Sequence, residues 1–326
     1  MTIDKKEITI ELGNYKGIEV KKHKLKVEEK EIDHSLDYLQ KSRAKIITIN
    51  SPAQKGNRTE IDFEVRSGGV QIENGLSKNH PLILGEGHFL PGFEDNLEGM
   101  KAGEEKEFSL KVPADWGDKR IADKNLDFKV KINIVQERQI PEINDEFAKS
   151  LGKFDSISAL KENIKQGLMQ EKEIFEKQRI RIEIIEKVAE NSKIEVPEEL
   201  VEKELENMVN EFKMSVDQFG MDFETYLTQI KATAEELKKG WKDQAVKRVK
   251  IGLCLKAIAD KEKIAPTTQE IEERMNQELM RLKVPPAGGI PTEVGNIDLV
   301  AFKEYTENIL INEKVFELLE QEAKII

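Results

Sequence analysis

The most informative part of the sequence is residues 82–112, which read LILGEGHFLPGFEDNLEGMKAGEEKEFSLKV. It opens as an apolar strand, turns at Gly85-Glu86-Gly87, and continues into a short helix that carries Phe89, Leu90 and Phe93. A Lys-Ala-Gly turn and a second strand follow. The glycine turn is too short to cradle a phosphate, and its carboxylate would repel one. We therefore interpret it as a tight turn between the strand and the helix.

Strand patterns lie on both sides of this stretch. Apolar and polar residues alternate from Ile61 to Val65, and the longest alternation runs from Leu126 to Ile134. Half of the twenty glycines fall between residues 56 and 137, where turns between strands need them. The sequence therefore predicts a small, mostly antiparallel sheet domain over residues 51–137.

After Pro141 the apolar spacing becomes helical, which predicts an all-α region over residues 138–326. A long helix, capped by Ser156 or Ser158, is expected to bury one face. Pro197 opens a second helix, and Pro266 separates two more, ahead of a closing helix over residues 302–319. Long helices with short connections predict antiparallel arms and an elongated body. The expected buried face of the first helix consists of Leu160, Ile164, Leu168, Phe175, Ile182 and Ile185.

Residues 1–50 combine weak strand alternation with a helical stripe of Ile32, Leu36 and Leu39. So brief a helix cannot bury its own stripe, because short helices depend on tertiary packing. We therefore expect this segment to be a linker strand and helix that pack on the all-α region. The fold class that follows is α+β and multidomain.

Composition excludes several classes of protein. The net charge of −11 argues against nucleic acid or an anionic membrane as the main partner, because both attract basic surfaces. The single cysteine, Cys254, excludes a disulfide framework and predicts a reducing, cytoplasmic location. None of the four histidines has a metal-ligand spacing, and no cofactor motif is present. We expect no metal and no cofactor.

Residues 82–112 and the flanking strands resemble the FKBP-type prolyl isomerases, in which the short helix forms the floor of the substrate pocket. The resemblance implies prolyl isomerase activity and an FKBP-like antiparallel sheet. It puts Phe93 beneath the bound proline ring, and Trp116 where relatives have a hydrogen-bonding tyrosine. The pocket residues that it implies are Phe63, Phe89, Leu90, Phe93, Trp116 and Phe128.

Two positions depart from the pattern of that family. Ile72 and His80 each stand where a phenylalanine is usual, and Glu73 occupies the acidic position beside the first. We include all three among the substrate-binding residues. The two departures predict a slower isomerase rather than a different fold.

The remaining sequence is similar to the trigger factor family of chaperones, in the right order over nearly the whole chain. The similarity is carried by residues 8–20, by the junction from Arg138 to Gly152, and by Val196–Leu205. The basic GFRxGK-type loop of that family's ribosome-docking domain does not occur in these 326 residues. We therefore expect no ribosome contact, and the sequence leaves self-association open.

The resemblance implies a chaperone that holds unfolded or nascent chains in a helical cradle and isomerises X–Pro bonds. Met214, Phe219 and Met221 fall near a helix end, where exposed apolar groups would contact a client. The alternative interpretation of these three residues is ordinary helix core. The alternative function is a non-catalytic scaffold whose FKBP-like domain only binds proline-containing segments.

Overall fold

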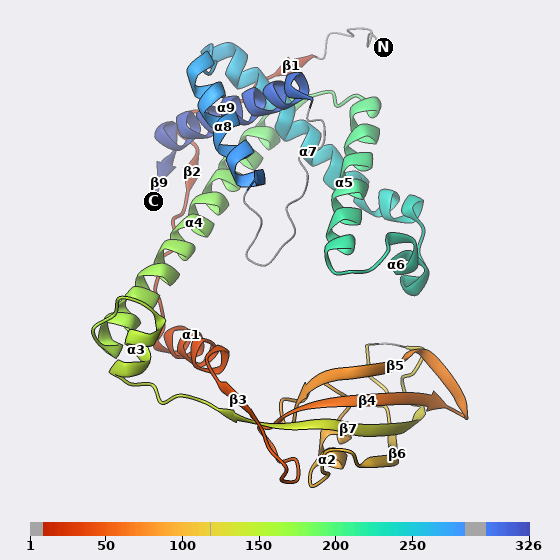
Figure 1. Ribbon diagram of the computed structural model, residues 1–326. Coiled ribbons are helices and arrows are strands. Elements are labelled where there is room, and N and C mark those ends of the chain that lie inside the picture. Colours follow the sequence, from red (N-terminus) through yellow and green to blue (C-terminus); the bar gives the residue numbers. More distant parts are fainter. Residues whose placement is uncertain (1–8, 118, 284–297) are drawn as a thin grey trace. The chain divides into compact units, whose positions relative to one another are not determined.

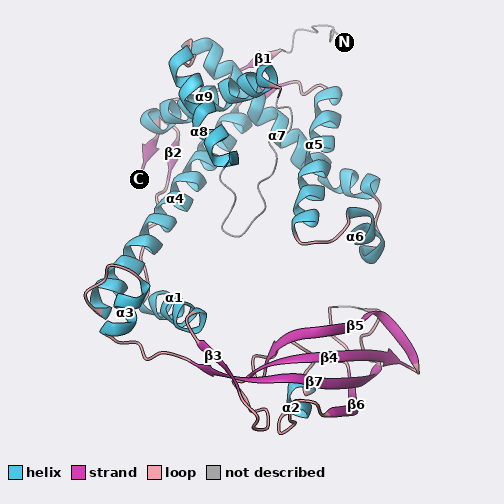
Figure 2. Ribbon diagram, in the orientation of Figure 1, coloured by secondary structure: helices cyan, strands magenta, loops and turns pink. Residues whose placement is uncertain are grey.

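The computed structural model describes residues 9–117, 119–283 and 298–326. The chain divides into two units. One unit joins the chain up to Leu25 to Gln170–Ile326, and the other is Lys26–Met169. Figure 1 follows the chain through both units, and Figure 2 separates their helices from their strands.

The unit Lys26–Met169 contains a five-stranded antiparallel sheet, so the predicted sheet is confirmed. The long strand β7 (Asn125–Gln139) is central: β4 pairs along one side of it, and β6 and β3 share the other. Strand β5 pairs with the outer side of β4. The remaining bounds are β3 Lys45–Thr48, β4 Arg58–Ser67, β5 Val70–Ile83, β6 Glu105–Lys111 and the short helix α2 Phe93–Leu97.

Alternation along β7 produces the core of the sheet. Leu126, Phe128, Val130 and Ile132 are buried, while the residues between them are exposed. Successive strand side chains point to opposite faces, so one face is apolar and α2 packs on it. Burying each such side chain stabilises the fold by about 1.5–3 kcal/mol.

The same unit has a small helical core. Helix α1 (Glu29–Ser42) starts in a capping box between Glu28 and Glu31. Its buried Ile32 and Leu36 cluster with residues of α3 (Asp145–Leu151) and with the start of α4 (Ile157–Asn191). The apolar stripe of α1 is therefore covered by residues that follow the sheet in the sequence.

The other unit is helical around a second core. Helices α4, α7 and α9 contribute Ile184, Ile258 and Leu319, which are fully buried, and Cys254 lies among them. Burial raises the pKa of the Cys254 thiol, as expected for an inert structural cysteine. The bounds of the helices are α5 Glu198–Gln218, α6 Phe223–Ile230, α7 Ala234–Glu262, α8 Thr268–Lys283 and α9 Leu299–Glu322.

Among the described residues, the segment 9–24 forms two short ladders in this unit. Strand β1 (Ile10–Glu11) pairs antiparallel with β8 (Lys193–Ile194), and β2 (Glu19–Val20) pairs parallel with β9 (Lys324–Ile325). Side chains add further anchors. Tyr15 donates to Glu262 at 2.8 Å, and the His23 backbone N–H donates to Glu176 at 2.6 Å.

Helix α4 differs from the prediction in its middle. Ser156 caps it as expected, accepting from Ala159 N–H at 3.2 Å. Phe175 and Ile182, however, are exposed, so their assignment to the buried face was wrong. Phe175 lies between the part of α4 that packs with α1 and α3, which ends at Met169, and the part buried in the second core, which begins at Ile180. Ile182 lies about 160° around the helix from the buried Ile180 and therefore faces away from that core. The residues buried further along α4 are Ile180, Ile184, Ile185 and Val188.

Candidate functional site

Aromatic rings from four strands and the segment around α2 meet on the apolar face of the sheet. Phe89 stacks on Phe93, with ring centroids 4.3 Å apart and an interplanar angle of 13°. The edge of Phe128 meets Phe93 at 5.2 Å, and Phe63 meets Phe89 edge-on at 5.5 Å. The His80 ring lies 5.5 Å from both Phe63 and Phe89. We call these five rings, together with Phe108, the aromatic cluster.

A bulge between β4 and β5 aims two of these rings. Ile61 pairs with His80 but Phe63 pairs with Ser77, so β5 has an extra residue here. The Asp62 carboxylate fixes the bulge by accepting from the Asn79 backbone N–H at 2.7 Å and from the Asn133 amide at 2.7 Å. These hydrogen bonds, first that of Asn79, lower the pKa of Asp62. Bulges commonly re-aim side chains beside functional sites.

A buried carboxylate organises the glycine turn. Glu94, in the first turn of α2, is nine-tenths buried and accepts three backbone N–H groups. The donors are Gly85, Gly87 and His88, at 2.6, 3.1 and 2.9 Å. Charge-assisted hydrogen bonds of this kind are about twice as strong as neutral ones. The turn was foreseen from the sequence, but the role of Glu94 was not.

Phe108 is the aromatic residue that sequence reasoning missed. Its ring stacks on Phe128 at 5.4 Å and lies 5.6 Å from Phe93. The two stacked residues are direct cross-strand partners in β6 and β7. The alternation of Phe108 with Leu110 marked its face of the strand, but only the register placed it beside Phe128.

The other implied pocket residues are distributed unevenly. Leu90 is buried in the core beside the cluster, and Ile72 and Trp116 pack against that core while half-buried. Ile72 has an aliphatic side chain, so it contributes no ring to the aromatic cluster. Glu73 lies in β5, and its side chain is outside the described residues.

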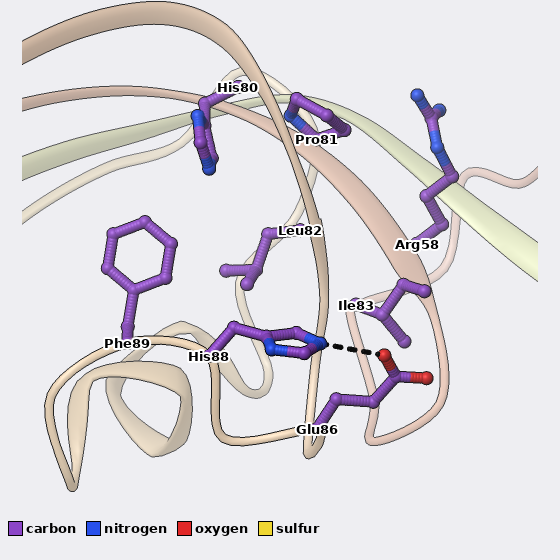
Figure 3. Close-up of a pocket in the computed structure, with 8 residues that line it drawn as sticks. All are labelled: Arg58, His80, Pro81, Leu82, Ile83, Glu86, His88 and Phe89. Atoms are coloured by element: carbon purple, nitrogen blue, oxygen red, sulfur yellow. Dashed lines mark hydrogen bonds and ion pairs between the residues drawn. The ribbon is translucent and has the colours of Figure 1, made fainter. Parts of the chain in front are cut away.

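A cavity of about 340 Å³ borders the cluster on the β5 side. Figure 3 shows Phe89, Leu82 and His80 facing this space, with His88 below them. Its charged side chains and His88 are already paired: His88 contacts Glu86 at 3.1 Å, Glu86 accepts from Arg138 at 3.1 Å, and Arg58 pairs with Glu60 at 3.0 Å. The lining residues are Arg58, His80, Pro81, Leu82, Ile83, Glu86, His88 and Phe89.

The three client-contact residues predicted in the helical unit have different surroundings. Met214 on α5 is 65% exposed, and Phe219, just after α5, is 88% exposed. Met221 is half-buried against a small core formed by Val216, Phe223 and Leu227. For Met221 the structure therefore matches the helix-core interpretation better than the exposed one.

The described residues contain neither a metal-binding cluster nor a membrane-spanning helix. No group of three or more His, Cys, Asp or Glu residues in that part of the chain is arranged to hold a metal ion. No helix within the described ranges is long and apolar enough to cross a membrane.

Comparisons with known proteins assign both regions. Residues 156–321 match the family model described as the bacterial trigger factor protein C-terminus. Residues 50–133 match the FKBP-type peptidyl-prolyl cis-trans isomerase model.

Curated relatives match over almost the whole chain. Trigger factor of Caldicellulosiruptor saccharolyticus is 32% identical over 315 residues, which cover 97% of this chain and 71% of that protein. Trigger factor of Staphylococcus epidermidis is 31% identical, covering 98% and 73%. A solved structure described as "Promiscuous Substrate Recognition in Folding and Assembly Activities of the Trigger Factor Chaperone" superposes with a TM-score of 0.50 at 22% identity, covering 97% and 73%.

Proposed function

Because the chain belongs to the trigger factor family and carries an FKBP-type prolyl isomerase domain, we propose that the aromatic cluster around Phe93 is the site of X–Pro isomerisation. The protein is a chaperone of unfolded or nascent polypeptides. The observation that supports the location is the convergence on one face of the sheet of rings from three separate segments: Phe63, the neighbouring pair Phe89 and Phe93, and Phe128.

Such a site can isomerise proline without a nucleophile or an acid. Rotation about the X–Pro bond has a barrier of about 18–20 kcal/mol, because it breaks amide resonance. The twisted amide is less polar than the planar one, so a dry aromatic wall favours the transition state over the solvated ground state. Hydrogen-bond donors beside the wall orient the substrate.

We propose two hydrogen-bond donors for this role. The Leu90 backbone N–H has no intramolecular acceptor within the described ranges, although the Leu90 side chain is buried beside the cluster. The Trp116 indole N–H is the second donor. We propose that Leu90 and Trp116 hold the substrate carbonyl groups while the rings enclose the proline.

We propose that Ile72 and His80 slow this isomerase and that Glu73 joins them at the rim. An aliphatic side chain and an imidazole replace two apolar rings, which leaves the wall less complete and less dry. His80 still packs edge-on against Phe63 and Phe89, so the fold of the site does not depend on the missing ring.

We assign client holding to exposed apolar side chains of the helical unit, with Met214 and Phe219 as the main contacts and Met221 as a minor one. Methionine suits this task because its flexible thioether adapts to varied apolar surfaces. Isolated exposed apolar side chains are common on proteins, so the test below measures holding directly.

A protease-coupled assay with an X–Pro peptide tests the isomerase. We expect the chain to accelerate the slow phase of the assay. Binding of the peptide without acceleration of that phase would support the scaffold alternative instead.

Light scattering of a diluted, denatured client tests holding. We expect the chain to reduce scattering in proportion to its concentration, and no reduction at molar excess would contradict the assignment.

The partners and location follow from composition as further proposals. We propose that these 326 residues do not bind ribosomes, nucleic acid or membranes, because their net charge is −11 and they contain no basic docking loop. Self-association is left to measurement. The one free, buried cysteine supports the cytoplasm as the compartment. We also keep residues 1–50, 51–137 and 138–326 as the proposed domain bounds.

A further inference from the structure

The floor of the proposed isomerase site is closed in this structure. Phe93 has no exposed surface at all, and the Phe89 ring lies flat over one of its faces at 4.3 Å. A client proline ring can stack on Phe93 only after one of the covering rings moves away. The question is which ring can move.

The three rings around Phe93 differ in how firmly they are held. Phe108 and Phe128 stack on each other and sit opposite each other in the β6–β7 ladder. Phe89 lies outside any strand or helix, is half-buried, and meets Phe63 and His80 only by its edges. Phe89 is therefore the one of these three rings that no strand ladder holds in place, although it contacts three other rings.

Space for that movement lies directly beside the ring. Phe89 borders the cavity of about 340 Å³, whose other walls include the apolar side chains of Leu82, Ile83 and Pro81. A cavity of about 150 Å³ in another protein holds a benzene molecule, so this one is large enough for a phenyl ring. Figure 3 shows the Phe89 ring at the edge of this space, with His80 and Leu82 facing it.

The backbone need not move with the ring. Glu94 holds the N–H groups of Gly87 and His88, the two residues directly before Phe89. Rotation about the side-chain bonds of Phe89 is then sufficient, and such rotations are fast compared with proline isomerisation.

We propose that Phe89 is a plug of the isomerase site: its ring occupies the place of the client's proline on Phe93 and turns into the neighbouring cavity when a client binds. The proposal rests on the proposed function of the aromatic cluster. The plug lowers the apparent affinity for a client, because only molecules with the plug open can bind. The free energy of one stacked aromatic pair corresponds to about a two- to tenfold reduction in the affinity for the client.

Filling the cavity tests the plug. Ile83→Trp places a large side chain in the space that the Phe89 ring needs, at a position outside the aromatic cluster. Leu76→Trp is the control, because Leu76 lies in the same strand but is exposed and does not border the cavity. We expect Ile83→Trp to raise KM for an X–Pro peptide about two- to tenfold, with Leu76→Trp unchanged.

The double variant Phe89→Ala with Ile83→Trp gives the decisive comparison. Without the plug ring the filled cavity should not matter, so Ile83→Trp should have no effect in the Phe89→Ala background. An Ile83→Trp effect equal to that of the control, or one that persists without Phe89, would overturn the plug. Phe93→Ala separates the two proposals: if it keeps the parent activity, the site itself is wrong and the plug falls with it.

A second measurement does not depend on the variants folding. In the parent protein, addition of the X–Pro peptide should shift the NMR signals of the Leu82 methyl groups, because the Phe89 ring current moves towards them. Signals of Leu82 that stay constant at saturating peptide would show that the ring does not enter the cavity, and would overturn the plug.

Discussion

The aromatic cluster and the exposed apolar residues of the helical unit differ in how much water reaches them. Phe93 is fully buried, whereas Phe219 is 88% exposed. Isomerisation needs a dry, fixed wall, since the gain comes from excluding water around a twisted amide. Holding needs exposed, adaptable groups that contact many sequences weakly. In these proposals the same residue type serves two tasks, and the exposure of its side chain decides which.

Phe93→Ala should have the largest effect of the variants below, because it should lower the isomerase activity and leave the helical unit unchanged. It removes the floor of the cluster, and we expect kcat/KM for an X–Pro peptide to fall on the order of a hundredfold. The cavity also destabilises the sheet by about 3–5 kcal/mol. Phe175→Ala is the matched control, because it makes the same change at an exposed position of α4. Hydrogen exchange should show the helical unit unchanged in both, and equal isomerase activity in both would remove Phe93 from the mechanism.

Glu94→Gln should weaken the cluster less strongly. It replaces a carboxylate that holds three N–H groups by an amide with one acceptor oxygen. We expect a loss of about 1.5–3 kcal/mol in the unfolding free energy of the sheet. Isomerase activity should fall as well, because Phe89 and Leu90 follow the loosened turn. Glu98→Gln, an exposed change just after α2, is the control. Denaturant midpoints that agree between the two variants would contradict the role of Glu94.

Replacing Met214 and Phe219 together by serine should affect holding alone. Both side chains are exposed, so the unfolding midpoint should not change. We expect the concentration that halves client scattering to rise about three- to tenfold, since apolar contact area is lost. Gln218→Ser between them is the control. If the double variant suppresses scattering like the parent, the client surface lies elsewhere on the helical unit.

Acid should loosen the helical unit through Glu176. The Arg179 guanidinium, and then the His23 backbone N–H, lower the pKa of Glu176 to about 2 from its ordinary 4.5. A carboxyl group with a lowered pKa adds stability that is complete above the ordinary pKa and is lost as pH falls towards the lowered one. The parent should therefore lose more thermal stability than Glu176→Gln between pH 5 and about pH 2. Parallel curves of Tm against pH for the two proteins would count against this anchor.

Deleting residues 56–137 and bridging the gap should have the smallest effect on holding. The cluster of Ile32, Leu36, Phe147 and Leu160 contains no residue from that segment, so α1 keeps its partners. We expect a folded, helical protein that suppresses scattering nearly as well as the parent, with proline-limited clients refolding more slowly. A well-folded deletion variant that suppresses nothing would transfer the holding function to the sheet domain.

The sequence by itself determined the order of the elements and the family resemblance. Period-two alternation identified β4, β6 and β7, because strand side chains alternate between an apolar and a polar face. Spacing of three and four residues identified the long helices, whose propensity and capping are local. The segment LPGFE, through the resemblance to the FKBP-type isomerases, predicted that Phe93 forms the floor of the proposed site.

Only the tertiary structure decided which of those residues meet and which are exposed. Phe108 joined the cluster through the β6–β7 register, and Glu94 reached the turn because α2 folds back under it. Phe175 had the spacing of a core residue but lies on a stretch of α4 that no apolar cluster of the described residues covers. Burial depends on contacts between segments distant in the chain, whereas periodicity reports only the local path of the backbone.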